Sequence, residues 1–486
     1  MCAAAPRGPI QNPMSVLEID ISTSPEALFR ASGGGSGAFW FDGPADGGGT
    51  FMGFPCTTQL LLRADGVAVI TGANAEREEH RDALGATERF VAGAPAPPDG
   101  SGAPHTVGFF AYDLIALLER RAQPRRDASA SLPLAWLARH DAVVEIPRTD
   151  AATRDARRVL RVHGVDAAAA ARGAEQVRRA DAAATRAPSP KRARATSVVL
   201  EGPHEERHLR AVRRALEYVA AGDVYQVNLA QRFRVRSDLE PFEAFLRLRE
   251  AQPVPFAAYL DCAGFSVLCG SPERFLRVQG GAIETEPIKG TRPRDRDPDA
   301  DRALRAALCG DAKERAEHVM VVDLERNDLG RVCVTGSVHV PSLMRVESFA
   351  TLHHMVSTVR GTLRTDVGLA ELLRATFPGG SITGAPKIRA AQVIAELEDA
   401  PRELYTGALF RFRGPRDFDS AIAIRTAVAR DGVYAYHAGG GIVADSDPVR
   451  EHRECLLKAE PFLRALDVAP FDVGETARDA QGRATA

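Results

Sequence analysis

Residues 255–278 read PFAAYLDCAGFSVLCGSPERFLRV, a segment whose apolar positions recur at the spacing of β-strands. Residues 224–235, VYQVNLAQRFRV, show the same pattern. Helical spacing is found instead at 208–222, which ends at the stop signal Gly222, and at 387–400. Because long strands are interleaved with helices without a regular strand–helix–strand repeat, the sequence predicts an α+β fold and not a doubly wound sheet.

Composition divides the chain into four parts. Residues 15–150 are rich in predicted strands, and 198–467 have the texture of a compact catalytic domain. Between them, 151–197 consist largely of alanine and arginine, which predicts a linker or insertion that adds little to a core and is dispensable. Its basic run PSPKRAR would suit a targeting or nucleic-acid segment, but no aromatic residues are interleaved with it. The polar tail 468–486 is expected to be disordered.

The overall composition favours an ordinary globular protein. The 486 residues are 45% hydrophobic, and 62 Lys and Arg nearly balance 64 Asp and Glu, for a net charge of −2. That balance argues against a nucleic-acid-binding surface. Seven cysteines without a CxxC pair are typical of reduced thiols. No signal peptide or membrane-spanning stretch is recognisable, so we expect a soluble, cytoplasmic protein.

Two pairs of glutamates have a spacing that suits a metal site. Glu314 and Glu317, and likewise Glu451 and Glu454, are three residues apart, so each pair lies on one face of a helix. Two such faces would offer the oxygen ligands that Mg²⁺ prefers. The alternative is structural, because each pair shortly follows an aspartate suited to begin a helix, where acidic residues are favourable.

Glycine-rich segments and one lysine are further candidates, although none is specific by itself. Residues 439–441 are glycines after an apolar strand, and their amides would either hold a carboxylate or phosphate or form a tight turn. Residues 377–387 lack phosphate-loop spacing, and 31–40 lack the dinucleotide fingerprint. Lys289 precedes Gly290 at the end of a predicted strand, where a lysine is a solvated surface group or, if desolvated, a nucleophile.

The order of several motifs points to a family. SPERF, EPIKGTRPR, EHVMVVDLERNDLGRV, FPGGSITGAPKIRA, AIRTA and GGGIVADSDP follow one another between residues 271 and 448, with GFFAYDL and DVYQVNLAQRF upstream. This series resembles the chorismate-using enzymes related to component I of anthranilate synthase and of aminodeoxychorismate synthase, over roughly 20–150 and 200–466. The resemblance implies a large two-sheet sandwich with helices outside and the site between the sheets.

The resemblance also implies roles for individual residues. Glu273 would be the general acid that protonates the departing C4 hydroxyl of chorismate, and Lys289 the nucleophile that attacks C2. Glu317 and Glu454 resemble ligands of Mg²⁺, a cofactor that would bind the ring carboxylate. The remaining implied positions flank the ion, clamp the enolpyruvyl carboxylate or line the pocket: Glu314 and Glu451; Arg425, Tyr405, Gly440 and Gly441; Thr291, His354 and Lys458.

Two positions distinguish the branches of this family. Relatives that add water to chorismate have a lysine base where this chain has Gln226, and an amide cannot take a proton from water. Anthranilate synthases resemble this chain here but typically read PIAGT where this chain reads PIKGT, with alanine in the place of Lys289. Residues 29–32 also lack the glutamate of the Leu-Leu-Glu-Ser element found in tryptophan-inhibited anthranilate synthases. The resemblance therefore favours aminodeoxychorismate synthase component I, which makes 4-amino-4-deoxychorismate for 4-aminobenzoate and folate synthesis.

The resemblance leaves alternatives and implies a partner. The alternatives are anthranilate synthase component I, in tryptophan synthesis, and a non-catalytic chorismate-binding paralogue, which would be expected to have lost the acids or Lys289. No glutaminase motif is recognisable, so ammonia is expected from a separate glutamine amidotransferase subunit. No lyase is recognisable either, so the product is expected to keep its enolpyruvyl group. Neither nucleic acid nor membrane is an expected partner.

Overall fold

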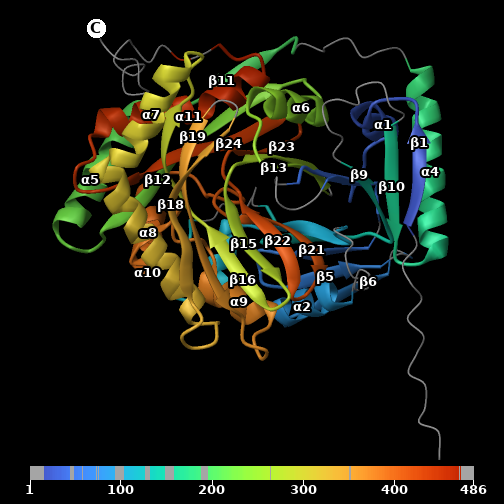
Figure 1. The fold of residues 1–486 in the computed structure, drawn as a ribbon, viewed down its shortest axis with the longest axis horizontal. Coiled ribbons are helices and arrows are strands. Elements are labelled where there is room, and N and C mark those ends of the chain that lie inside the picture. The colour runs from blue at the N-terminus through green and yellow to red at the C-terminus, as the bar shows by residue number, and fades with distance from the viewer. Residues whose placement is uncertain are drawn as a thin grey trace, which may run out of the picture.

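Two large antiparallel sheets face each other in this protein, and helices cover their outer faces (Figure 1). The computed structural model describes residues 16–43, 49–56, 58–72, 74, 76–93, 103–125, 132–147, 158–187, 195–262, 264–349, 352–469 and 471. The predicted α+β fold, a two-sheet sandwich with helices outside, is confirmed.

The first sheet joins strands from both ends of the chain. Its strand order is β1 (Val16–Ile21), β10 (Arg158–Gly164), β9 (Ala142–Ile146), β3 (Thr50–Gly53), β2 (Phe39–Phe41), β13 (Phe256–Cys262), β14 (Phe265–Ser271), β23 (Thr426–Arg430), β24 (Val433–Ile442), β12 (Gln226–Ser237) and β11 (Val198–Glu201), and β20 (Gly384–Ala385) also pairs with β12. The predicted strand at 224–235 is β12, next to the end strand β11, and 255–278 forms β13 and β14 in the middle of this sheet and then enters the second sheet as β15 (Arg274–Gln279).

The second sheet is built in the same way. Its strand order is β17 (Ile288–Pro293), β19 (Leu352–Thr362), β16 (Ala282–Glu286), β15 (Arg274–Gln279), β22 (Asp417–Ile422), β21 (Ala408–Gly414), β7 (Thr106–Phe110), β8 (Ala135–Arg139), β4 (Gln59–Leu62), β5 (Ala68–Thr71) and β6 (Arg77–His80), and β18 (His339–Ser348) pairs with β19. Strands from residues 50–150 therefore enter both sheets, and the N-terminal region shares its sheets with the remainder of the chain.

Side chains alternate between the two faces of each strand, so the buried residues form one inner core between the sheets and one outer core on the far face of each sheet. In β2, Phe39 and Phe41 pack between the sheets, whereas Trp40 points to the opposite face. In β21, Leu409 packs between the sheets and Phe410 points outward. Because side chains alternate across a strand, apolar residues at consecutive positions are buried on both faces only when each face is covered.

Helices provide that cover. Their bounds are α1 (Pro25–Ala31), α2 (Ala83–Ala92), α3 (Ile115–Leu118), α4 (Ala167–Arg186), α5 (Glu205–Ala220), α6 (Pro241–Ala251), α7 (Pro298–Gly310), α8 (Ala312–Gly330), α9 (Leu369–Thr376), α10 (Lys387–Leu397) and α11 (Pro448–Ala465). Helices α1, α4, α6 and α11 cover the first sheet, and α2, α8 and α9 cover the second. Both helices predicted from periodicity are present, as α5 and α10.

The prediction of a linker or insertion at 151–197 is wrong for residues 158–186. Strand β10 pairs with both β1 and β9 in the first sheet, and α4 runs along the same edge, at the right of Figure 1. Val177 of α4 is fully buried in the outer core. A Cβ at Gly173 would lie 2.8 Å from Ala142 Cβ, so the helix approaches the sheet closely because its inner face carries only small side chains. A scarcity of large apolar residues here reflects close packing.

Other expectations concern the whole chain. None of the helices in the described segments combines the length and apolar character needed to cross a bilayer. Cys56, Cys262, Cys269, Cys309, Cys333 and Cys455 are free thiols. The tail predicted to be disordered at 468–486 falls almost entirely outside the described residues.

Candidate active site

A cleft of about 1200 Å³ opens between the two sheets. Its walls come from β17 of the second sheet, β24 of the first, and the helices α8 and α11. The lining includes these residues singled out from the sequence: Glu273, Lys289, Thr291, Glu314, Glu317, His354, Tyr405, Arg425, Gly440, Gly441, Glu451, Glu454 and Lys458. Residues separated by up to 185 positions in the chain are thus gathered around one space.

The glycines at 439–441 lie inside a strand, so the tight-turn alternative is wrong. They belong to β24 and pair with β12, with Gly439 opposite Ala230. A Cβ at Gly439 would lie 2.1 Å from Leu229 O, and one at Gly441 would lie 3.0 Å from Nε2 of Gln226 and 3.2 Å from Nζ of Lys289. The missing side chains therefore make room for the neighbouring strand and for two of the predicted site residues.

Gln226 differs from the other predicted residues because it lies behind the surface of the cleft. It begins β12, and its side chain is only 1% exposed. Its Oε1 atom is buried and has no hydrogen-bond partner, while its Nε2 atom lies against Gly441. The amide thus sits next to Lys289 without offering a base.

Lys289 lies in an irregular part of β17. The pairing of β17 with β19 shifts between Ile288 and Thr291, and such a bulge re-aims the side chains within it. Nζ of Lys289 lies 3.2 Å from Oε2 of Glu317, across the cleft on α8. The lysine is therefore paired with an acid of the site and is not a solvated surface group.

Glu273 is a buried carboxyl at the floor of the cleft. It precedes β15 and is 5% exposed. Oγ of Ser381 donates a hydrogen bond to Oε1 (2.9 Å), and the backbone amide of Ile288 donates another to the carboxyl. Burial outweighs these hydrogen bonds and raises the pKa of Glu273 from 4.5 to about 7. A carboxyl with that pKa still holds a proton near neutrality, as a general acid requires.

Both glutamate pairs face the cleft, and both also follow helix caps. Asp311 Oδ1 accepts a hydrogen bond from the amide of Glu314, at the start of α8. Asp447 caps α11 in the same way. The structural alternative is therefore confirmed for these helix starts, and the capped first turns also line the cleft, where a metal site stays a prediction.

The electrostatics of the four glutamates differ. Burial is the main cause of the raised pKa of Glu314 and of Glu451, and the neighbouring glutamate of each pair adds to it. The ammonium of Lys458, 2.6 Å from Glu454, lowers the pKa of that carboxyl. In the described part of the chain, no three His, Cys, Asp or Glu side chains are grouped so as to hold a metal ion as they stand. The donor chemistry suits Mg²⁺, but Glu317 and Glu454 are paired with lysines.

Arg425 and several uncharged polar and aromatic residues line another part of the cleft. Arg425 adopts a left-handed backbone (φ 52°) and its Nη1 donates to the carbonyl of Lys458 (3.0 Å). Burial, helped by Arg425, lowers the pKa of His354 to about 4, so its ring is neutral near pH 7. That ring shares a hydrogen bond with Oγ1 of Thr291 (2.9 Å). The buried ring of Tyr405 stacks on His437, with centroids 5.3 Å apart. This part of the cleft suits a carboxylate ligand.

Comparison with known proteins shows which family the chain belongs to. Residues 38–464 match the family described as chorismate binding enzymes. The chain belongs to that family.

Its relatives include proteins named aminodeoxychorismate synthase and anthranilate synthase. An aminodeoxychorismate synthase of Streptomyces pristinaespiralis is 48% identical over 56% of this chain and 38% of its own length. Aminodeoxychorismate synthase component 1 of Escherichia coli is 46% identical over 52% of this chain and 56% of its own length. Anthranilate synthase component 1 of Aquifex aeolicus is 47% identical over 53% and 52%. The chain thus spans between about two fifths and just over half of these relatives.

Solved structures agree on the fold. Anthranilate synthase component I from Streptococcus pneumoniae has a TM-score of 0.71 to this chorismate binding enzyme, at 26% identity, over 91% of this chain and 94% of that one. The isochorismate synthase MenF of Escherichia coli has a TM-score of 0.65 at 18% identity, which shows the shared fold alone. The relatives named aminodeoxychorismate synthase and the relative named anthranilate synthase are almost equally identical to this chain, so overall identity does not separate the two branches.

Three residues at the site received no role from the sequence. Ser381 holds Glu273, Arg292 pairs with Glu314 (3.4 Å), and Asn228 lines the cleft with its Oδ1 buried and unpartnered. All three stand within motifs that identified the family, but the motif gives only their position along the chain. The contacts that assign them to the site exist only after folding.

Proposed function

We propose that this chain is component I of aminodeoxychorismate synthase, which joins ammonia to chorismate to form 4-amino-4-deoxychorismate. The observation that supports this proposal is that Lys289 and Glu273 line one cleft, and that the carboxyl of Glu273 holds a proton near neutrality. The backbone amide of Ile288, the residue before Lys289, donates a hydrogen bond to that carboxyl. Gln226 beside them offers no base for water. The names of the Streptomyces and Escherichia coli relatives support the same activity.

The chemistry divides one displacement into two steps. Nζ of Lys289, as the free amine, forms a bond to C2 of the ring while the double bonds shift and the C4–O bond breaks. Glu273 gives its proton to the departing hydroxyl, which leaves as water. Ammonia then forms a bond to C4, the double bonds shift back, and the C2–Nζ bond breaks to release the lysine. Nitrogen therefore arrives para to the ring carboxylate.

The walls of the cleft suit the two carboxylates of chorismate. Arg425 and the amides of Gly440 and Gly441 would hold the enolpyruvyl carboxylate, with Tyr405 beside them. Lys458 would add positive charge on the same side, where its Nζ already donates to the carbonyl of Gly439. His354 and Thr291 would border the ring as a neutral, hydrogen-bonded pair.

Mg²⁺ is proposed as the cofactor. Glu317 and Glu454 would bind it directly, and each would exchange its lysine partner for the ion. Glu314 and Glu451 would flank the ion. When bound, the ion supplies positive charge that neutralises the ring carboxylate and fixes the ring. The raised pKa of Glu314 and of Glu451 supports this proposal, because their buried charges would be stabilised by a nearby cation.

Ammonia is proposed to come from a glutamine amidotransferase subunit. The designation component 1 of the Escherichia coli relative supports a two-subunit enzyme. The purified chain should then use ammonium salts at raised pH, where free NH₃ is available, and should not use glutamine. Turnover of glutamine by the chain alone would show that an amidotransferase activity has been overlooked.

A product assay tests the proposal. Wild-type chain with chorismate, Mg²⁺ and ammonium should form 4-amino-4-deoxychorismate, and an added lyase should release 4-aminobenzoate and pyruvate. Lys289→Ala should lose most of this activity, whereas Lys313→Ala, a second lysine lining the cleft, should keep it. Formation of anthranilate and pyruvate without a lyase would favour the anthranilate synthase named for the Aquifex relative and would refute the proposal.

A further inference from the structure

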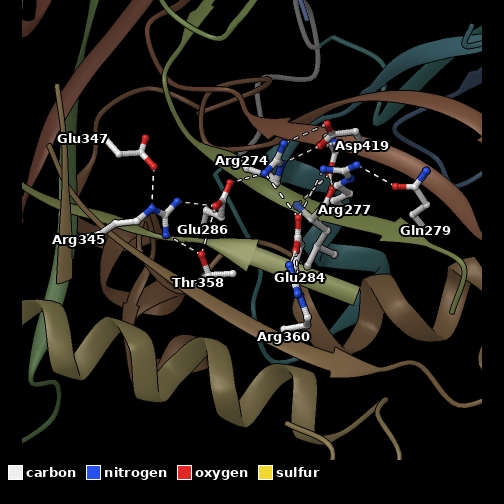
Figure 2. A network of polar contacts seen from close by, with 12 residues as sticks. Arg274, Arg277, Gln279, Glu284, Glu286, Arg345, Glu347, Thr358, Arg360 and Asp419 are labelled. Atoms are coloured by element: carbon white, nitrogen blue, oxygen red, sulfur yellow. Dashed lines mark hydrogen bonds and ion pairs between the residues drawn. The ribbon is translucent and has the colours of Figure 1, made fainter. Parts of the chain in front are cut away.

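A network of ion pairs joins β15, β16, β18, β19 and β22 of the second sheet (Figure 2). Arg274 directly follows Glu273, and Glu286 lies three residues before Lys289; Arg274 and Glu286 are register partners in β15 and β16. One oxygen of the Glu286 carboxylate accepts from the Arg274 guanidinium, and the other accepts from Nη2 of Arg345 on β18 (2.6 Å). Glu286 therefore bridges three strands beside the cleft.

The inner end of this network is buried. The side chain of Arg274 is 2% exposed, and its Nε donates to Oδ1 of Asp419 (3.1 Å), whose side chain is 4% exposed. A buried guanidinium that pairs with several carboxylates has few alternative orientations, because each charge-assisted hydrogen bond fixes direction as well as distance. Besides Glu286 and Asp419, the carboxylate of Glu284 lies 3.7 Å from Arg274 Nη1, but Glu286 stands nearest in the chain to Lys289.

Backbone pairing is irregular next to Glu273 and around Lys289, so it does not by itself fix the positions of these two side chains. The register of β15 shifts between Arg274 and Arg277 against both β16 and β22. The register of β17 shifts between Ile288 and Thr291, on either side of Lys289. A bulge leaves residues outside the regular ladder, so other contacts must hold the chain there. The side-chain network supplies such contacts at Arg274, where the irregular part of β15 begins, and at Glu286, two residues before the irregular part of β17.

We propose that Glu286 is a positioning residue: by holding Arg274 and Arg345 together, it fixes the start of β15 against the start of β17, so that the Ile288 amide meets the Glu273 carboxyl. This inference rests on the proposed function for the roles of Glu273 and Lys289. It assigns to Glu286 no contact with substrate.

A neighbouring glutamate provides a matched control. Glu284 lies two residues earlier on β16, and its carboxylate pairs with Arg360 (2.6 Å) and lies 3.8 Å from Arg277 and 3.7 Å from Arg274. Its side chain is 13% exposed, against 21% for Glu286. Glu284→Gln and Glu286→Gln therefore remove the same charge from the same strand and network. They differ in that Glu286 accepts hydrogen bonds from both Arg274 and Arg345 and lies three residues before Lys289, whereas Glu284 lies 3.7 Å from Arg274 and pairs chiefly with Arg360.

The experiment measures chorismate consumption and backbone amide exchange in both variants. Glu286→Gln should lower kcat by about tenfold or more, because misplacement by about 1 Å costs up to a hundredfold, and should change KM by less than about twofold. Amide exchange in the peptide covering 286–291 should become faster. Glu284→Gln should keep kcat within about twofold and leave exchange in that peptide unchanged.

A second variant keeps the test decisive if Glu286→Gln does not fold. Arg345→Gln removes only the outer arm of the network, and should lower kcat a few-fold with KM unchanged. Unaltered kcat in Glu286→Gln or in Arg345→Gln, or an equal loss in Glu284→Gln, would overturn the inference. Neither readout depends on which product forms, so a wild-type chain that made a different product would refute the proposed function and leave this inference standing.

Discussion

Replacing Glu273 with glutamine is expected to stabilise the folded protein while abolishing most of its activity. Glutamine has nearly the same shape, and its amide oxygen can still accept the hydrogen bond from Ser381 Oγ. It cannot give a proton to a leaving hydroxyl. The substitution therefore separates the chemical role of the carboxyl from its effect on folding.

The size of the stabilisation follows from the pKa of Glu273. Burial raises that pKa from 4.5 in the unfolded chain to about 7 in the folded one. The folded state thus binds the proton more tightly, so the wild type is destabilised as pH rises from about 4.5 to about 7. Each pKa unit corresponds to about 1.4 kcal/mol, which makes the full effect about 3 kcal/mol above that range. Glutamine does not titrate and escapes this loss.

Urea unfolding of both proteins from pH 4.5 to 8.5 measures the effect. The difference in unfolding free energy between Glu273→Gln and wild type should rise with pH and level off near pH 8. Wild-type kcat/KM, calculated for the concentration of free NH₃ at each pH, should fall as pH rises through about 7, because the protonated carboxyl is the active form. Parallel stability curves for the two proteins would refute a raised pKa at Glu273, and with it the argument for this residue as the acid.

Three further predictions concern the metal, the choice of nucleophile and the N-terminal edge of the first sheet. Chelation should abolish turnover, and Mg²⁺ should restore it. Glu317→Gln or Glu454→Gln should raise the Mg²⁺ concentration needed for half-maximal activity. Full activity of either variant at limiting Mg²⁺ would contradict the ligand assignment. Gln226→Lys should admit water as nucleophile and yield some hydroxylated isomer, and product analysis that finds only the amino compound would count against it. Val177→Ala in α4 should lower the unfolding free energy by about 1–3 kcal/mol, because its side chain is fully buried; an unchanged urea midpoint would mean that α4 contributes no packing.

The segment 151–197 marks the limit of prediction from composition. Alanine and arginine gave no apolar periodicity strong enough to predict a core helix, yet 158–164 form a strand and 167–186 a helix. The helix is nevertheless buried on one face, because Gly173 and its alanines let it approach β9 and β10 closely. Small side chains bury area only when a partner surface fits against them, and that surface comes from residues far away in the chain.

The glycines at 439–441 mark a second limit. Their sequence suited either an anion cradle or a turn, and the structure places them in the last part of β24, paired with β12 in an antiparallel ladder. Which glycine faces the cleft depends on the register of β24 against β12, with Gly441 opposite Asn228. Register is set by the packing of both sheet faces, and a one-residue slip would reverse every side chain.

Much of this protein was determined by the sequence alone. Strand and helix spacing predicted the α+β class, since local periodicity reflects which face of each element is buried. The order of motifs predicted the family and thirteen residues that line one cleft. Only the tertiary structure decided how those residues interact: that Lys289 pairs with Glu317, that Glu273 keeps its proton because it is buried, and that Glu286 links the strands beside them. These properties depend on distance and desolvation between segments remote in sequence, which no local pattern encodes.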